Sequence, residues 1–149
     1  MSAVPSNPAP APPPPAAVGP AANLRLRGVV ILVLVLVEIL LGNQLAVAGS
    51  PYPIAYLVVH ILVAVLVCGF AGHIVLLAWK RTQTPIRVAA AITFLSAVGA
   101  TLGGTWFLVG GMSNPALYTM EALGGLAFLG AILVIVLGGP APAPKPVAA

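Results

Sequence analysis

The chain has 149 residues, of which 60% are hydrophobic and only 5% are charged. A soluble globular domain carries about a quarter charged residues, and six basic with two acidic side chains cannot cover the surface of a water-soluble protein of this length. The composition therefore excludes an ordinary soluble domain and indicates a protein surrounded by lipid.

The two ends of the chain are rich in proline and alanine. Residues 1–22 contain an unbroken proline run, Pro12 to Pro15, and residues 140–149 repeat the pattern around Lys145. Proline has no amide donor and fixes φ, so such segments favour an extended conformation and do not build a core. We expect two disordered tails that act as solvated spacers, with a proline-rich ligand for a partner domain as the less favoured alternative.

Between the tails lie four apolar segments, each reaching the ~20 residues that a helix needs to cross the hydrocarbon of a bilayer. They cover about residues 28–48, 54–79, 86–109 and 115–137. The β-branched run from Val30 to Val37 would favour a strand in water, but a lone strand in lipid leaves its backbone groups unpaired. The sequence thus predicts an all-α membrane protein, with residues 23–139 forming four transmembrane helices in an up-and-down bundle.

The breaks between these segments agree with four helices. Gly49 to Pro53 separates the first two, Lys80 to Pro85 the next two, and Gly110 to Pro115 the last two. In the last break Asn114 can cap a helix whose first residue is Pro115, where a missing N–H has no consequence.

The basic residues predict the orientation. With four spans they all fall on one side of the membrane, which the positive-inside rule identifies as the cytoplasm; they are Arg25, Arg27, Lys80, Arg81, Arg87 and Lys145. We expect a multi-pass protein of a prokaryotic plasma membrane with both termini in the cytoplasm. Because the basic residues are few and flank apolar runs, no nucleic-acid partner is expected.

Small residues indicate how the helices pack. Gly99 and Gly103 form a Gly-x-x-x-Gly pair, and the fourth segment carries Gly124, Gly125 and Gly130. Such residues let helix backbones approach closely in lipid. This favours a compact bundle and a homo-oligomer equally, and other membrane proteins are expected as partners too.

Polar groups within the spans are the only signal of function. The rise of 1.5 Å per residue places Glu38, Asn43, His60 and Glu121 together in the outer half of the bundle. Because a carboxylate in hydrocarbon is costly, it usually faces protein or water. The cluster is either a site for a proton, a cation, a quinone or a haem, or a set of hydrogen bonds between helices.

The two histidines share one predicted helix, thirteen residues apart, or roughly 20 Å along its axis. In this they resemble membrane b-type cytochromes, which stack two haems on histidine-bearing helices. Two histidines in all cannot supply a pair for each of two haems. A single b-type haem held by His60 with Met120 or Met112 is the form that the resemblance allows, with His73 as a further contact to haem or quinone.

Three classes of function follow. The first, which we rank highest because the chain is small and has few polar groups, is a non-catalytic subunit or scaffold of a larger membrane complex. The second is a redox protein binding one haem or a quinone near His60. The third is a small carrier or proton pathway using Glu38, His60 and Glu121. An enzyme is less expected, since the chain has no aspartate for a Ser-His-Asp triad and too few ligands for zinc.

Overall fold

The computed structural model describes residues 20–48, 53–81, 83–110 and 114–139. Within these ranges the chain forms four helices and no strand: α1 (Pro20–Ala48), α2 (Ile54–Trp79), α3 (Thr84–Val109) and α4 (Asn114–Leu137). The prediction of an all-helical chain is confirmed.

The helix boundaries match the predicted spans closely except at the start of α1. This helix begins at Pro20, so residues 20–22, predicted to belong to a disordered tail, are helical. Proline is well tolerated in the first turn, and Ala21 and Ala22 are good helix formers. Leu24 in this early turn is 1% exposed and joins the core. Residues 1–19 and 140–149, the rest of the predicted tails, lie outside the described residues.

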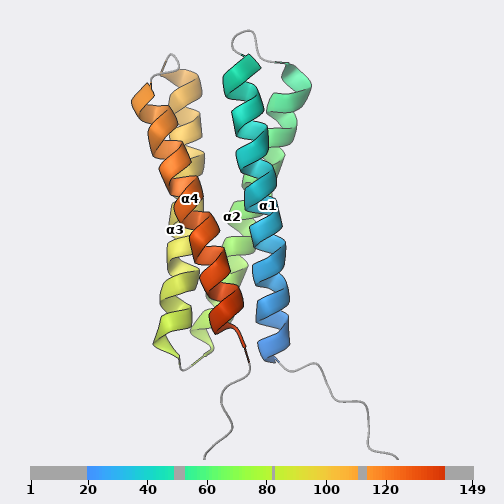
Figure 1. The fold of residues 1–149 in the computed structure, drawn as a ribbon, viewed down its shortest axis with the longest axis vertical. Coiled ribbons are helices and arrows are strands. Elements are labelled where there is room, and N and C mark those ends of the chain that lie inside the picture. The colour runs from blue at the N-terminus through green and yellow to red at the C-terminus, as the bar shows by residue number, and fades with distance from the viewer. Residues whose placement is uncertain (1–19, 49–52, 82, 111–113, 140–149) are drawn as a thin grey trace, which may run out of the picture.

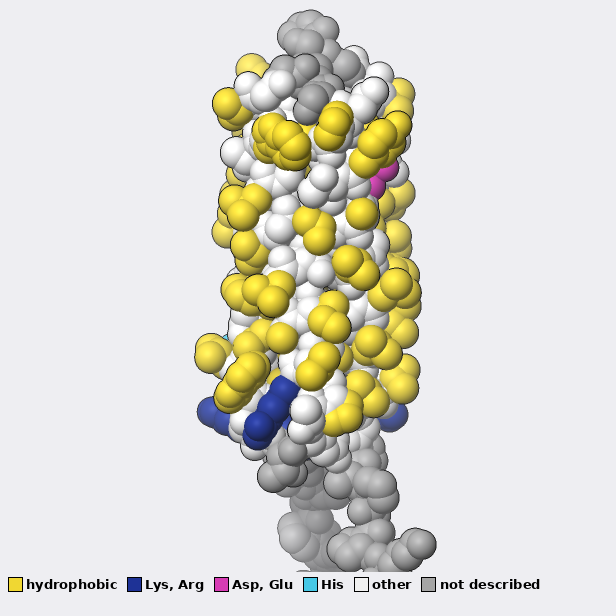
Figure 2. Space-filling model, turned by 90° about the vertical axis from the view of Figure 1, so that its left-hand side faces the viewer, with side chains coloured by type: hydrophobic (Ala, Val, Ile, Leu, Met, Phe, Trp, Pro, Cys, Tyr) yellow, Lys and Arg dark blue, Asp and Glu magenta, His cyan; other side chains and the backbone are white. Residues whose placement is uncertain are grey.

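The helices are arranged as two hairpins, α1–α2 and α3–α4, in which neighbours run in opposite directions (Figure 1). Each helix contacts the next along the chain, and α4 also contacts α1, which closes the ring. The start of α1, the end of α4 and the connection between α2 and α3 all lie at one end of the molecule (Figure 1). We call this the basic end, because Figure 2 shows the lysine and arginine side chains gathered there.

The surface between the two ends is apolar, as expected for contact with lipid. Figure 2 shows hydrophobic side chains along the whole length of the visible face, and leucines such as Leu62, Leu95 and Leu129 are more than half exposed. The helices α2, α3 and α4 are long and apolar enough to cross a membrane. A membrane-spanning role for α1 stays a prediction.

Small residues bring α3 and α4 together inside the chain. A Cβ atom added to Gly103 would lie 3.4 Å from Cα of Met120, and one added to Gly99 would lie 2.8 Å from Leu123 Cδ1. The Gly-x-x-x-Gly pair therefore packs against α4 of the same chain. A homo-oligomer stays a prediction, but this motif no longer argues for it.

The basic half of the molecule is filled by larger side chains. Leu24, Ile31, Ile74 and Val134 are fully buried there. At its edge the Nε–H of Arg25 donates a hydrogen bond of 3.2 Å to the carbonyl oxygen of Ile135. A cation near the last carbonyls of a helix also interacts favourably with the helix dipole, so this contact ties the start of α1 to the end of α4.

Candidate ligand-binding site

A cavity of about 540 Å³ lies between the helices, in the half of the molecule away from the basic end. All four helices contribute to its wall, including Glu38 and Gly42 of α1, His60 of α2, Thr101 of α3 and Met120 of α4. The two hairpins lie farther apart at this end than at the other (Figure 1). The size of the cavity and its mostly apolar lining are typical of sites for small molecules.

The cavity exists because the facing positions of α3 and α4 carry side chains too small to fill it. Ala100 and Gly104 of α3 and Gly124 and Gly125 of α4 line it, and nothing lies within 4 Å of a Cβ atom added to Gly125. Since a protein interior is normally close-packed, a space of this size between four helices has room for another molecule.

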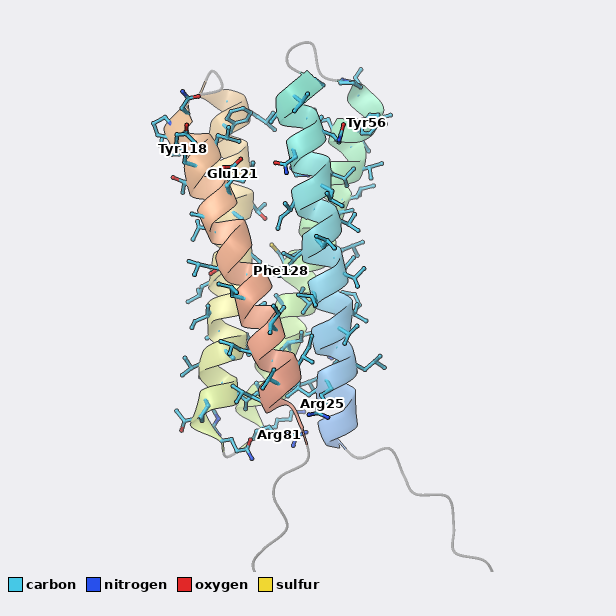
Figure 3. The ribbon with its side chains drawn as sticks, viewed as in Figure 1. Arg25, Tyr56, Arg81, Tyr118, Glu121 and Phe128 are labelled. Atoms are coloured by element: carbon cyan, nitrogen blue, oxygen red, sulfur yellow. The ribbon has the colours of Figure 1, made fainter. Side chains whose placement is uncertain are left out.

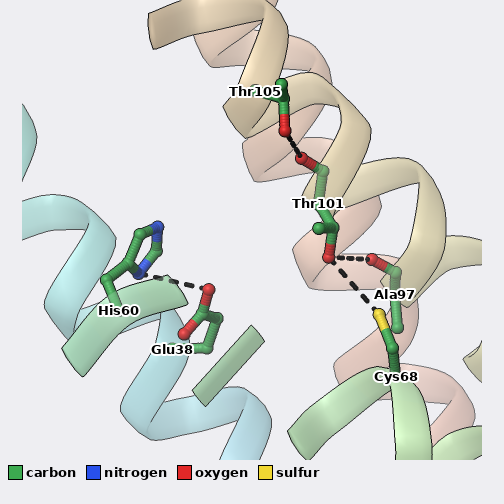
Figure 4. A network of polar contacts seen from close by, with 6 residues as sticks. All are labelled: Glu38, His60, Cys68, Ala97, Thr101 and Thr105. Atoms are coloured by element: carbon green, nitrogen blue, oxygen red, sulfur yellow. Dashed lines mark hydrogen bonds and ion pairs between the residues drawn. The ribbon is translucent and has the colours of Figure 1, made fainter. Parts of the chain in front are cut away.

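A carboxyl group and an imidazole meet in the cavity wall. His60 Nδ1 lies 3.1 Å from Glu38 Oε1, and the two side chains are 15% and 21% exposed; Figure 4 shows the pair between α1 and α2. The distance is that of an ion pair, but His60 Nδ1 and Glu38 Oε2 are both buried without a hydrogen-bond partner among the described residues. Buried polar atoms normally have partners, so the protein alone leaves this pair incompletely satisfied.

Two threonines on α3 also line the cavity, and sequence reasoning missed them. Thr101 Oγ1 donates to the carbonyl of Ala97 at 3.0 Å, and Thr105 Oγ1 donates to the carbonyl of Thr101 at 3.0 Å. Cys68 Sγ lies 3.4 Å from Thr101 Oγ1 (Figure 4). Because each hydroxyl proton is donated to a backbone carbonyl of α3, the hydroxyl oxygens can still accept hydrogen bonds from a ligand. The four-residue spacing of two hydroxyls on an apolar helix was the available signal.

The four residues of the predicted polar cluster all line this cavity. Glu38 and His60 are in contact, whereas Asn43 and Glu121 are exposed; Glu121 lies toward the same end of α4 as Tyr118 (Figure 3). No contact joins Asn43 or Glu121 to the Glu38–His60 pair among the described polar interactions.

Of the residues proposed to contact haem or quinone, some line the cavity and one does not. Met120 lines the cavity, and a Cβ atom on Gly42 would lie 3.3 Å from His60 Cε1 and 3.9 Å from Met120 Cε. His60 and Met120 therefore approach the same glycine. His73 is exposed on α2 and does not line the cavity, and Met112 lies outside the described residues.

Comparisons with protein-family models, with curated proteins and with solved structures found no match to this chain.

Proposed function

We propose that this chain is a four-span membrane protein that binds a lipid-soluble molecule with a polar head group in its cavity. The supporting observation is the Glu38–His60 pair, incompletely satisfied by the protein, in the wall of a cavity of about 540 Å³ that is otherwise mostly apolar. A few convergent polar groups in an apolar pocket orient a ligand whose body is held by burial.

A quinone is the ligand class that matches these groups best. Its carbonyl oxygens accept hydrogen bonds from an imidazole N–H, and the hydroxyls of its reduced form donate to a carboxylate. With Nδ1 of His60 facing Glu38, the other ring nitrogen, Nε2, is available to the ligand. An isoprenoid tail would lie against the apolar lining.

We also propose how the protein lies in the membrane. Here α1 is the fourth span of an up-and-down bundle, and the basic end faces the cytoplasm of a prokaryotic cell, as the segregation of basic residues favours. The cavity then lies in the outer half of the bilayer, where a lipid-soluble ligand can enter from the membrane.

A carrier or proton pathway receives less support. A carrier or proton pathway needs a polar route to the cytoplasmic side, but apolar side chains fill the basic half, and the buried hydroxyl of Thr93 there donates to its own helix at Ala89 O. A scaffold role stays a prediction, which co-purification of partner subunits would test.

A single b-type haem is the second candidate, because His60 and Met120 approach the same glycine within the cavity. Imidazole nitrogen and thioether sulfur form a known axial pair for haem iron, and Glu38 at Nδ1 would orient the imidazole. Purified protein would then show a Soret band that disappears in His60→Ala.

For the quinone, the test is a titration of purified protein in lipid nanodiscs with a short-chain ubiquinone analogue, followed by quenching of tryptophan fluorescence. We expect saturable binding that His60→Phe and Glu38→Gln each weaken about tenfold, since each change removes a hydrogen-bonding group worth about 1–1.5 kcal/mol.

The matched control is His73→Phe, the same change on the same helix but outside the cavity. Its affinity should equal that of the unchanged protein. Equal affinities for His60→Phe and His73→Phe would show that the cavity does not bind the quinone.

A further inference from the structure

The connection between α2 and α3 carries an uncompensated positive charge. Lys80, Arg81 and Arg87 lie at or beside it. The only two acidic side chains of the chain, Glu38 and Glu121, line the cavity in the opposite half. No carboxylate side chain is therefore placed to neutralise this part of the basic end; Figure 2 shows dark blue lysine and arginine side chains at this end, with the visible magenta carboxylate near the other.

Two arginine nitrogens at this connection lack partners. Arg81 Nη2 and Arg87 Nε are buried from solvent and have no hydrogen-bond partner among the described residues. Arg25 at the same end differs, because its Nε–H donates to Ile135 O; Figure 3 shows Arg25 and Arg81 at this end. A buried guanidinium N–H without an acceptor is costly, so a side-chain movement that brings these half-buried arginines to an acceptor would be favoured here.

The start of α3 adds to the attraction for an anion. Its N-cap, Gln83, has an extended backbone and makes no side-chain hydrogen bond to the helix, and Arg87 lies in the first turn. The uncapped N–H groups and the helix dipole favour negative charge at this position. The charge, the unpaired nitrogens and the open helix end all lie at one connection.

The surroundings distinguish a lipid from a free anion. Trp79 directly precedes the basic residues and is 59% exposed, and Val88 follows them and is 51% exposed. A ligand here would have a charged group at the arginines and an apolar part beside exposed apolar side chains. Basic sites at the cytoplasmic ends of transmembrane helices bind anionic lipid head groups in this way.

We propose that Arg81 and Arg87 form a binding site for the phosphate of an anionic phospholipid at the α2–α3 connection. The guanidinium groups donate hydrogen bonds to the phosphate oxygens, and the acyl chains lie along the apolar surface beside Trp79 and Val88. This site is separate from the cavity and does not depend on what the cavity binds.

The test is native mass spectrometry of the full-length protein in detergent, titrated with phosphatidylglycerol or with phosphatidylcholine. We expect a first phosphatidylglycerol to bind at least about tenfold more tightly than phosphatidylcholine, because each basic residue near the surface contributes about 1 kcal/mol, or roughly fivefold. Millimolar inorganic phosphate should not displace it, which separates a lipid site from a general phosphate site.

The decisive comparison is between two double variants that each remove two positive charges. Arg81→Gln with Arg87→Gln should weaken phosphatidylglycerol binding about tenfold more than Arg25→Gln with Arg27→Gln on α1, in which all three basic residues of the α2–α3 connection are kept. Circular dichroism would check that both variants keep their helices. Equal losses in the two variants, equal affinity for the two lipids, or displacement by phosphate would each overturn the proposal.

Discussion

Replacing Gly130 with alanine is expected to lower the free energy of unfolding by about 1–3 kcal/mol, the usual cost of overpacking a well-packed contact. A Cβ atom at this position would lie 2.5 Å from Thr93 Oγ1 and 3.1 Å and 3.2 Å from the backbone N and Cα of Thr93. Thr93 cannot turn away easily, because its hydroxyl donates to Ala89 O at 2.8 Å. The two helix backbones would have to separate.

The matched control is Gly125→Ala on the same helix, where an added Cβ meets nothing within 4 Å. Alanine has the higher helix propensity by about 1 kcal/mol, so this variant should be as stable as the unchanged protein or more so. Reversible unfolding in mixed detergent and dodecyl sulfate micelles, followed by circular dichroism, measures both. Equal stability of the two variants would mean that α3 and α4 do not approach at Gly130.

An all-or-none pattern is expected when single cysteines are labelled from either side of the membrane. In a Cys68→Ala background, cysteines replacing Ser2 and Ala148 should react only from the cytoplasmic side, and those replacing Ser50 and Ser113 only from the outside. The reason is that all six basic residues lie at the start of α1, at the α2–α3 connection or in residues 140–149, which the positive-inside rule keeps in the cytoplasm. The connections with Ser50 and Ser113 carry no basic residue.

The outcome that would contradict four spans is reaction of the Ser2 and Ser50 positions from the same side, because α1 would then lie outside the bilayer core. The cysteine-free Cys68→Ala protein serves as the background control, and the unchanged protein, with Cys68 as its single cysteine, serves as the control for a cysteine between the helices. Cys68 is part-buried and contacts Thr101, so it should label poorly from both sides.

The number and approximate extent of the helices could be predicted from the sequence. In hydrocarbon an apolar run of sufficient length has helix as its one stable form, because every backbone group must be paired internally. The predicted range 54–79 is that of α2, bounded by Pro53 and Lys80. The start of α1 could not be predicted, since the turn containing Leu24 has no long apolar run and is held by packing against the core.

The relative level of Glu38 and His60 along the bundle could be predicted as well, because each residue of a helix rises by a constant 1.5 Å. Glu38 and His60 were expected at neighbouring levels, and they are in contact. What the rise does not specify is the rotation of each helix about its axis. A helix that is apolar all round has no polar face to reveal which side is buried, and so His73 could be placed at a depth but not on the exposed side of α2.

The sequence was therefore sufficient for the apolar character of the chain, the extent of the helices and the relative level of Glu38 and His60, because these depend on composition and on distance along one helix. Only the packing of the four helices decided that Glu38, His60, Thr101 and Met120 share one cavity. The cavity arises where the small residues of α3 and α4 face α1 and α2, and such facing depends on contacts between segments far apart in the chain. The physical reason is that a side chain in this protein is buried by contact with a neighbouring helix. The sequence of one uniformly apolar helix does not specify which of its sides makes that contact.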